Sequence, residues 1–141
     1  MEFALVVPLL TMILFGIISY GVMLSFRQSL SQAAAEGARA AAVTFVEDDK
    51  KDEAVLAVSG ALDSFNVTCT DAGNLVRDGD DVGECDISDP KACVPAAAAG
   101  VQCVIVTLTY DYQDNSIVPT FPGVGIVLPD KLTYEAQARV S

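Results

Sequence analysis

The sequence predicts an α+β fold in which a long N-terminal α-helix, apolar in its first half, precedes a small disulfide-bonded head with an antiparallel β-sheet. Three observations predict it. Residues 3–26 carry no charge, two segments near the C-terminus alternate apolar and polar residues, and all four cysteines follow residue 46. We therefore expect two parts, a membrane-inserted or assembly-core helix over 1–46 and an acidic, β-rich head over 47–141.

The uncharged N-terminal run is long enough to cross a bilayer, because residues 3–26 would form about 36 Å of helix. A cleaved secretory signal has a basic start and a shorter apolar stretch, whereas here Met1 and Glu2 precede an apolar run that is too long. Glu2 would complement the positive end of the helix dipole, and in a buried place it would need a cationic partner such as a chain's free amine.

An alanine-rich tract, SLSQAAAEGARAAAV over residues 29–43, follows Arg27. Since no proline or turn cluster interrupts residues 11–46, we expect one helix of about 66 Å. The small residues of this tract would form a smooth face suited to packing against another helix, although good helix propensity alone also explains them. The face comprises Ala34, Gly37, Ala38, Ala41 and Ala42.

Pro8, Gly16 and Gly21 interrupt the apolar half of the expected helix. Proline lacks an amide donor and clashes with the preceding turn, and glycine lowers helix propensity. We expect bending or local unwinding near these positions, although glycines are also ordinary in membrane helices.

The clearest strands of the head are residues 101–112 and 131–141, which we expect to pair antiparallel with one face on a helix. The first places Val104, Val106, Leu108, Tyr110 and Tyr112 on one face. Their connection, residues 114–129, is rich in proline and glycine and is expected to be a loop that touches a neighbouring subunit.

Upstream, residues 54–65 (AVLAVSGALDSF) have the spacing of a short amphipathic helix on the sheet, and residues 65–70 that of a first strand followed by a turn at 72–74. Residues 47–53 form a charged surface cluster before that helix. Its inward positions are expected to be Val55, Leu56, Ser59 and Leu62.

Four cysteines in a domain that the helix would hold outside the cytoplasm predict disulfides. Three pairings are possible; we favour Cys85–Cys93, closing an Asp/Pro-rich loop, and Cys69–Cys103, joining strands. A metal site is the alternative, but no CxxC pair and no histidine accompany the cysteines, and the absence of histidine also excludes haem attachment through C-x-x-C-H.

Composition argues against catalysis and against binding of nucleic acid. Without histidine the chain lacks the commonest general base, so we expect neither an enzyme nor a cofactor. The net charge of −11 lies entirely after Phe45 and would repel nucleic acid. The acidic cluster at 78–84 is interpreted as a solvated turn, with calcium binding as the alternative, and Asn66 starts a glycosylation pattern within an expected strand.

Both ends of the chain carry a family resemblance. Residues 2–10 read EFALVVPLL, and Gly16, Arg27 and the alanine-rich tract follow; near the C-terminus stand VIVTLTYDYQ (104–113) and LTYEAQARVS (132–141). These segments resemble TadE-like pilins of the tight-adherence (Tad/Flp) branch of the type IV pilus systems. The resemblance implies a prepilin peptidase, a pilus assembly machinery, other pilins and the inner membrane as partners.

Together these features predict a pilin-like structural subunit that is first inserted in the membrane and then polymerises through its helix into an extracellular filament, displaying the head for adhesion. Alternatives are a minor pilin that primes or tips a filament of another protein, and a membrane-anchored surface binding module. In the assembly Glu2 would make the carboxylate register contact. The expected helix-packing residues are Phe3, Pro8, Gly16, Gly21, Ala34, Gly37, Ala38 and Ala41.

Overall fold

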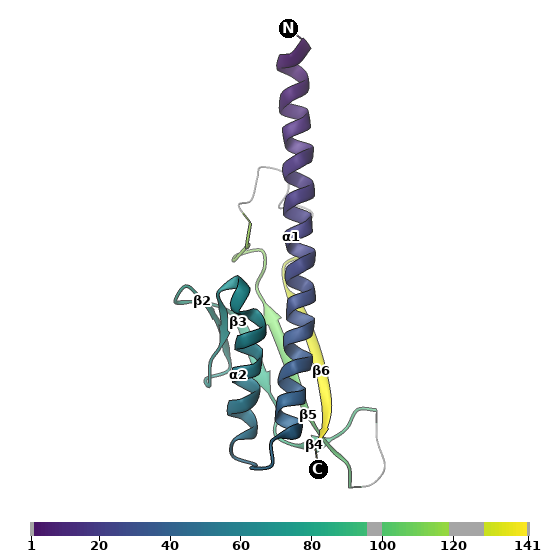
Figure 1. The fold of residues 1–141 in the computed structure, drawn as a ribbon, viewed down its shortest axis with the longest axis vertical. Coiled ribbons are helices and arrows are strands. Elements are labelled where there is room, and N and C mark those ends of the chain that lie inside the picture. Colours follow the sequence, from purple (N-terminus) through teal and green to yellow (C-terminus); the bar gives the residue numbers. More distant parts are fainter. Residues whose placement is uncertain (1, 96–99, 119–128, 141) are drawn as a thin grey trace.

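The computed structural model describes residues 2–95, 100–118 and 129–140, with the side chains of residues 2, 4 and 5 left out. Its main feature is α1 (Glu2–Val43), one continuous helix of 42 residues. The first half of α1 extends beyond the rest of the molecule, and the second half lies along the head (Figure 1). The prediction of a single long helix is confirmed. The helix continues through Pro8, Gly16 and Gly21, so the local unwinding expected there is absent from α1.

A second helix, α2 (Lys50–Leu62), runs beside α1 and ends in the 3₁₀ turn η1 (Asp63–Phe65). It begins four residues earlier than predicted, inside the charged cluster, where Asp52 and Glu53 in the first turn favour the positive end of the helix dipole. Its buried stripe is Ala54, Val58 and Leu62, at i, i+4 spacing.

The predicted inward face of this helix is wrong at Leu56, whose side chain is 65% exposed. The physical reason is that the neighbour of α2 is α1 as well as the sheet. The carbonyl of Ala54 and the side chain of Val58 both lie against Gly37 of α1, and this close approach turns Leu56 to the outside.

The six strands form one antiparallel sheet. β1, β2, β3 and β5 pair in that order, and β5 also pairs with β4 and with β6. The central strand β5 pairs with β6 along its whole length, from Gln102↔Val140 to Tyr110↔Leu132, which confirms the predicted C-terminal pair. The strands are β1 (Val67–Cys69), β2 (Asn74–Arg77), β3 (Asp80–Ile87), β4 (Lys91–Ala92), β5 (Gln102–Tyr110) and β6 (Leu132–Val140).

The hairpin of β2 and β3 was not predicted. Its two turn residues, Asp78 and Gly79, have φ of 53° and 95°, the positive values of the tight two-residue hairpin turn, and Arg77 pairs with Asp80 across it. β3 then pairs with β5 from Gly83↔Tyr110 to Ile87↔Val106. The acidic cluster therefore begins in the turn of this hairpin and continues into β3.

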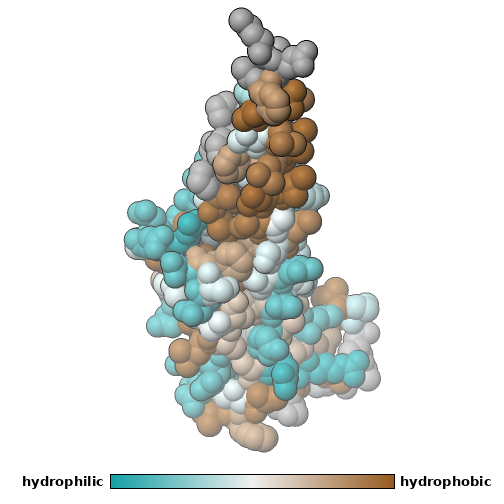
Figure 2. Space-filling model, turned by 45° about the horizontal axis from the view of Figure 1, so that its top comes forward, coloured by the Kyte–Doolittle hydropathy of each residue, from teal (hydrophilic) through white to brown (hydrophobic). Residues whose placement is uncertain are grey.

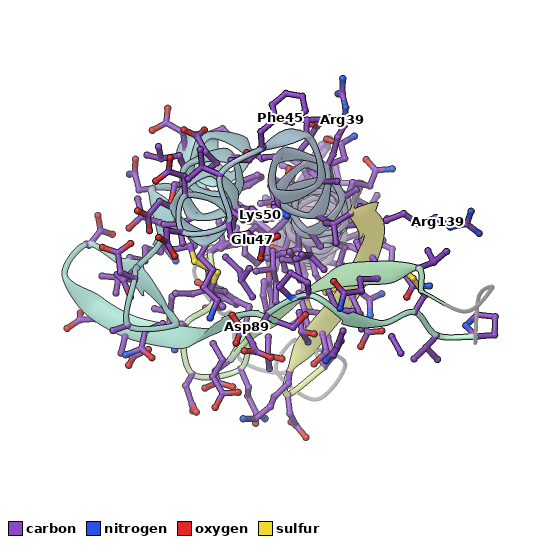
Figure 3. The ribbon with its side chains drawn as sticks, turned by 90° about the horizontal axis from the view of Figure 1, so that it is seen from below. Arg39, Phe45, Glu47, Lys50, Asp89 and Arg139 are labelled. Atoms are coloured by element: carbon purple, nitrogen blue, oxygen red, sulfur yellow. A yellow bond between two sulfur atoms is a disulfide. The ribbon has the colours of Figure 1, made fainter. Side chains whose placement is uncertain are left out.

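Both helices cover the same face of the sheet, so the head has two layers (Figure 3). The predicted inner face of β5 is confirmed, since Val104, Val106, Leu108 and Tyr110 are all buried, as is Tyr112 just after it. The second half of α1 supplies the opposite side of this core. Its buried residues are Met23, Phe26, Leu30, Ala33, Ala34, Ala38 and Ala41.

All four cysteines form disulfides, as predicted, but the favoured pairing is wrong. The bonds are Cys69–Cys85 and Cys93–Cys103. The turn after β1 places Cys69 beside the β3 residue Cys85, whose amide donates to the carbonyl of Gly73. Cys93 follows β4, which pairs with β5 so that Lys91 lies opposite Cys103. The unpredicted hairpin is the physical reason for the error, because it brings Cys85 back toward β1.

Candidate assembly surface

The first half of α1 is an uncovered apolar rod. Phe3 is 85% exposed, and large apolar side chains remain exposed on all sides of the helix as far as Tyr20. Figure 2 shows this end of the molecule as a continuous hydrophobic surface above a mixed, largely hydrophilic head. By length and composition α1 contains one candidate membrane span, within Val6–Val43. Such an area is too large to remain in water, so it requires lipid or other protein.

Several predicted packing residues lie on this rod and are little covered by the described part of the chain. Phe3 and Pro8 are exposed, and a Cβ added at Gly16 or Gly21 would meet no atom within 4 Å. These positions are therefore free to contact lipid or another helix. The side chain of Glu2 lies outside the described part, so its register contact stays a prediction.

The predicted small-residue face lies in the interior of the subunit and not on its surface. Ala34, Ala38 and Ala41 are buried inside the subunit, and a Cβ at Gly37 would stand 2.6 Å from Cγ2 of Val58 and 3.6 Å from Cγ1 of Val106. Gly37 thus allows α1, α2 and β5 to meet at close range. The face does pack against a helix, but that helix is α2 of the same chain. Contacts of these four residues with another subunit stay a prediction, which this burial disfavours.

An aromatic cluster holds α1 at the point where the helix enters the head. The ring of Phe26 lies 5.0 Å from that of Phe65 and 4.7 Å from that of Tyr110, both edge-on, and 6.2 Å from that of Tyr112. Edge-on pairs at these distances contribute about 0.5–1.5 kcal/mol beyond their burial. The sequence predicted a packing role for Phe26 at the end of the apolar run, but not its aromatic partners.

Polar groups fix the tyrosine side of this cluster. The Tyr110 hydroxyl donates to the carbonyl of Asn115 at 2.8 Å and lies 3.4 Å from Nη1 of Arg77. Burial raises the pKa of Tyr110 and, together with the neighbouring Tyr110 phenol, that of Tyr112. Both phenols therefore stay protonated to a higher pH than an exposed tyrosine does.

The two arginines of α1 differ in their surroundings. Arg39 is exposed and pairs with Glu36 at 3.5 Å. Arg27 is half-buried, and its Nε atom is buried without a hydrogen-bond partner among the described residues. No ion pair involves Arg27 in the part of the chain that the structure describes.

The far end of the head combines charged and apolar groups (Figure 3). Lys50, only 4% exposed, donates to Oε1 of Glu47 at 2.9 Å, and Lys51 pairs with Asp89 at 2.8 Å beside a cavity of about 160 Å³. Phe45 points away from the sheet and is 98% exposed. Within the described residues, no group of three or more His, Cys, Asp or Glu side chains is placed to hold a metal ion.

The loop predicted to touch a neighbouring subunit cannot be placed in full. Its residues 119–128 lie outside the described part of the chain. Asn66, which starts the glycosylation pattern, is not in a strand; it follows η1 with a φ of 56° and is exposed.

Comparison with known proteins gives one match. No curated protein and no solved structure matches the chain. The family model described as TadE-like protein matches residues 1–39, which cover the exposed rod, the Phe26 position and most of the small-residue face. The resemblance of the opening segment to TadE-like proteins is thus confirmed, because residues 1–39 are similar to that family.

Proposed function

We propose that the chain is a structural pilin subunit that polymerises through the first half of α1 into an extracellular filament of the Tad type. One observation carries this proposal: the same helix is uncovered and apolar over its first half and packed into the core of a head over its second. A simple membrane anchor needs no such rigid continuation. The head is thereby held at a defined position relative to the rod.

The physical sequence of events follows from the uncovered surface. In the membrane, lipid covers the apolar rod before assembly. In a filament, rods of other copies replace the lipid, and the acidic heads remain in water on the outside. Each copy would contact the next through different surfaces, and contacts of this kind grow into a helical filament when their rotation does not close into a ring. The partners would be other copies, other pilins, the prepilin peptidase and the assembly machinery.

Imaging and composition of surface filaments test the proposal. Filaments are sheared from cells that produce the chain, imaged by electron microscopy and analysed by mass spectrometry. We expect this chain to be the main protein of the shaft. Its presence only in trace amounts would make it a minor pilin, and its retention in the membrane without filaments would make it an anchored binding module; either result contradicts the proposal.

A substitution in the rod gives a second test. Gly16→Leu enlarges a position where an added Cβ would meet no described atom within 4 Å, and it keeps the segment apolar. We expect normal membrane insertion and folding but fewer filaments, since helices that approach closely at a glycine cannot do so at leucine. Leu56→Ala, an exposed change on the head, serves as the control and should leave the filament yield unchanged.

A further inference from the structure

Asn66, Val67 and Thr68 form an acceptor pattern for N-linked glycosylation that the proposed function does not use. The pattern is an asparagine followed two residues later by a threonine, and it is typical of surface loops in secreted proteins. The sequence predicted a strand over residues 65–70, which would include Asn66. In the structure β1 begins at Val67, so Asn66 lies in the turn between η1 and this strand.

The turn leaves the side chain of Asn66 at the surface. Asn66 has φ of 56° and ψ of 31°, the left-handed conformation, and its backbone N–H donates to the carbonyl of Asp63 at 2.9 Å. The residue is exposed, and its carboxamide makes no hydrogen bond within the described part of the chain. A transferase could therefore bind this carboxamide without breaking a contact of the fold.

Thr68, the second residue of the pattern, also lies on the outside. In β1 the side chains of Val67 and Cys69 are buried, whereas Thr68 between them is exposed. Its hydroxyl lies 3.4 Å from the carbonyl of Val76, beyond the usual O–H···O range of about 2.5–3.0 Å, so it is held weakly. Val67 thus anchors the segment in the core while the two residues of the pattern face solvent.

The other two asparagines of the chain have neither feature. Asn74 is half-buried in β2, and Asn115 is half-buried with its Nδ2 donating to the carbonyl of Asp111 at 3.3 Å. Neither is followed two residues later by serine or threonine. The asparagine in the acceptor pattern is thus also the asparagine with an exposed carboxamide.

We propose that Asn66 is the attachment site of an N-linked glycan. In this reaction Nδ2 of Asn66 attacks C1 of a sugar that is carried on a polyprenyl pyrophosphate. The N–C1 bond forms as the bond from C1 to the pyrophosphate oxygen breaks. The pyrophosphate leaves with the electron pair, and a base of the transferase takes one amide proton.

The site rests on one part of the proposed function, the placement of the head outside the cytoplasm. Both disulfides support that placement, because disulfides form and persist in oxidising compartments. The site does not require a filament. It would be equally open on a membrane-anchored chain that displays the same head.

The glycan would stand at the end of the head nearest the rod. α2 runs back toward the rod, and η1 and Asn66 follow it directly (Figure 1). Phe65 contacts Phe26 of α1 at a ring distance of 5.0 Å, whereas the next residue, Asn66, is exposed. A bulky, hydrophilic group at this position would keep this flank of the head in water and out of contacts between subunits.

Peptide mass mapping of the full chain, purified from the cells that naturally produce it, tests the site. After reduction, trypsin should release residues 52–77, which contain Asn66. We expect this peptide to carry the added mass of sugar units, and electron-transfer fragmentation should place them on Asn66. An unmodified peptide, or sugar found only on a serine or threonine of the same peptide, would overturn the proposal.

Matched variants separate the acceptor from the turn. Asn66→Gly keeps the left-handed conformation, which glycine adopts readily, but lacks the acceptor nitrogen. Thr68→Val removes the hydroxyl and keeps a β-branched residue in the strand, whereas Thr68→Ser keeps the pattern. We expect complete loss of the sugar in the first two variants and its retention in the third. Both native disulfides should persist in all three, which shows that the head still folds.

The glycan and the proposed function fail in different ways. If filaments lack this chain but residues 52–77 carry sugar on Asn66, the proposed polymerisation is wrong and the glycan site stands. If filaments contain the chain and this peptide is unmodified, the function stands and the glycan site is wrong. Sugar that persists on the peptide of the Asn66→Gly chain would also contradict the assignment.

Discussion

Gly37 is a position where an added methyl group would disturb the packing of α1 against α2. A Cβ there would press on Val58 of α2, with the Ala54 carbonyl 3.5 Å away on the same helix. We expect Gly37→Val to lower the free energy of unfolding by about 2–3 kcal/mol, the cost of overpacking a tight core. Urea titration of the full chain in detergent micelles measures this.

A matched pair of variants separates packing from helix propensity at this position. Gly60→Val on α2 has nothing within 4 Å of the added Cβ and should change stability by no more than about 0.5 kcal/mol. Val58→Ala should restore part of the stability lost in Gly37→Val, since neighbours in contact are not additive. Equal losses at both glycines would contradict the close packing of the two helices.

Tyr110 and Tyr112 make the head sensitive to alkali. Burial raises the pKa of each phenol in the folded state above its unfolded value, which is near 10. The unfolded chain therefore loses these protons first, and their contribution to stability is complete below about pH 10 and is lost as the pH rises through the folded pKa. We expect the melting temperature to fall above about pH 10. Tyr112→Phe should reduce that fall, and an unchanged slope would count against the burial of this phenol.

At the scale of elements, the two disulfides close short loops in the sheet, with sequence separations of 16 and 10. We expect replacement of either cysteine pair by serine to cost about 2–4 kcal/mol, with the larger loss at Cys69–Cys85 because its loop is longer. Thermal unfolding of the paired variants measures this. Peptide mapping under non-reducing conditions checks the pairing itself, and a fragment linking Cys85 to Cys93 would refute it.

The periodic elements could be predicted from the sequence, and those that depend on tertiary contacts could not. Apolar length identified α1, and strict alternation identified β5 and β6. β3 reads DDVGECDI, with acids and a glycine that disfavour strands, and it forms because β5 offers a partner. The Asp78-Gly79 pair was the available signal for its hairpin.

The candidate site shows the same division. The exposed rod could be predicted from composition. The partner of the small-residue face could not, because the sequence pattern of small residues is the same whether α2 or a helix of another chain packs against it. The burial of Lys50 could not be predicted either, since lysines are rarely buried and its partner Glu47 is a local, exposed residue. Cysteine connectivity depends on strand order, which spacing does not give.

At the scale of the whole molecule, the core of the head begins on α1 well before residue 47. Ser19 and Met23 are the first buried positions of the described helix, and Phe26 and Leu30 follow. We expect residues 19–141 to fold as a soluble monomer without detergent, since the most apolar exposed surface is removed. Size-exclusion chromatography and circular dichroism test this.

Shorter fragments locate the boundary of that core. A chain starting at residue 31 lacks Phe26 and Leu30 and should be unstable or aggregate. If residues 47–141 fold alone with the stability of the 19–141 fragment, then the packing of α1 on the sheet contributes little and the division after residue 46 holds.

The placement of the disulfides has a mechanical consequence. Both crosslinks lie between residues 69 and 103, and α1 contains no cysteine. Tension along a filament built on α1 would act lengthwise on the contact between this helix and the sheet, which buried side chains of both elements form. The sheet would stay covalently closed while α1 is pulled from it. Under force, the subunit would thus yield by withdrawal of its helix before its head unravels.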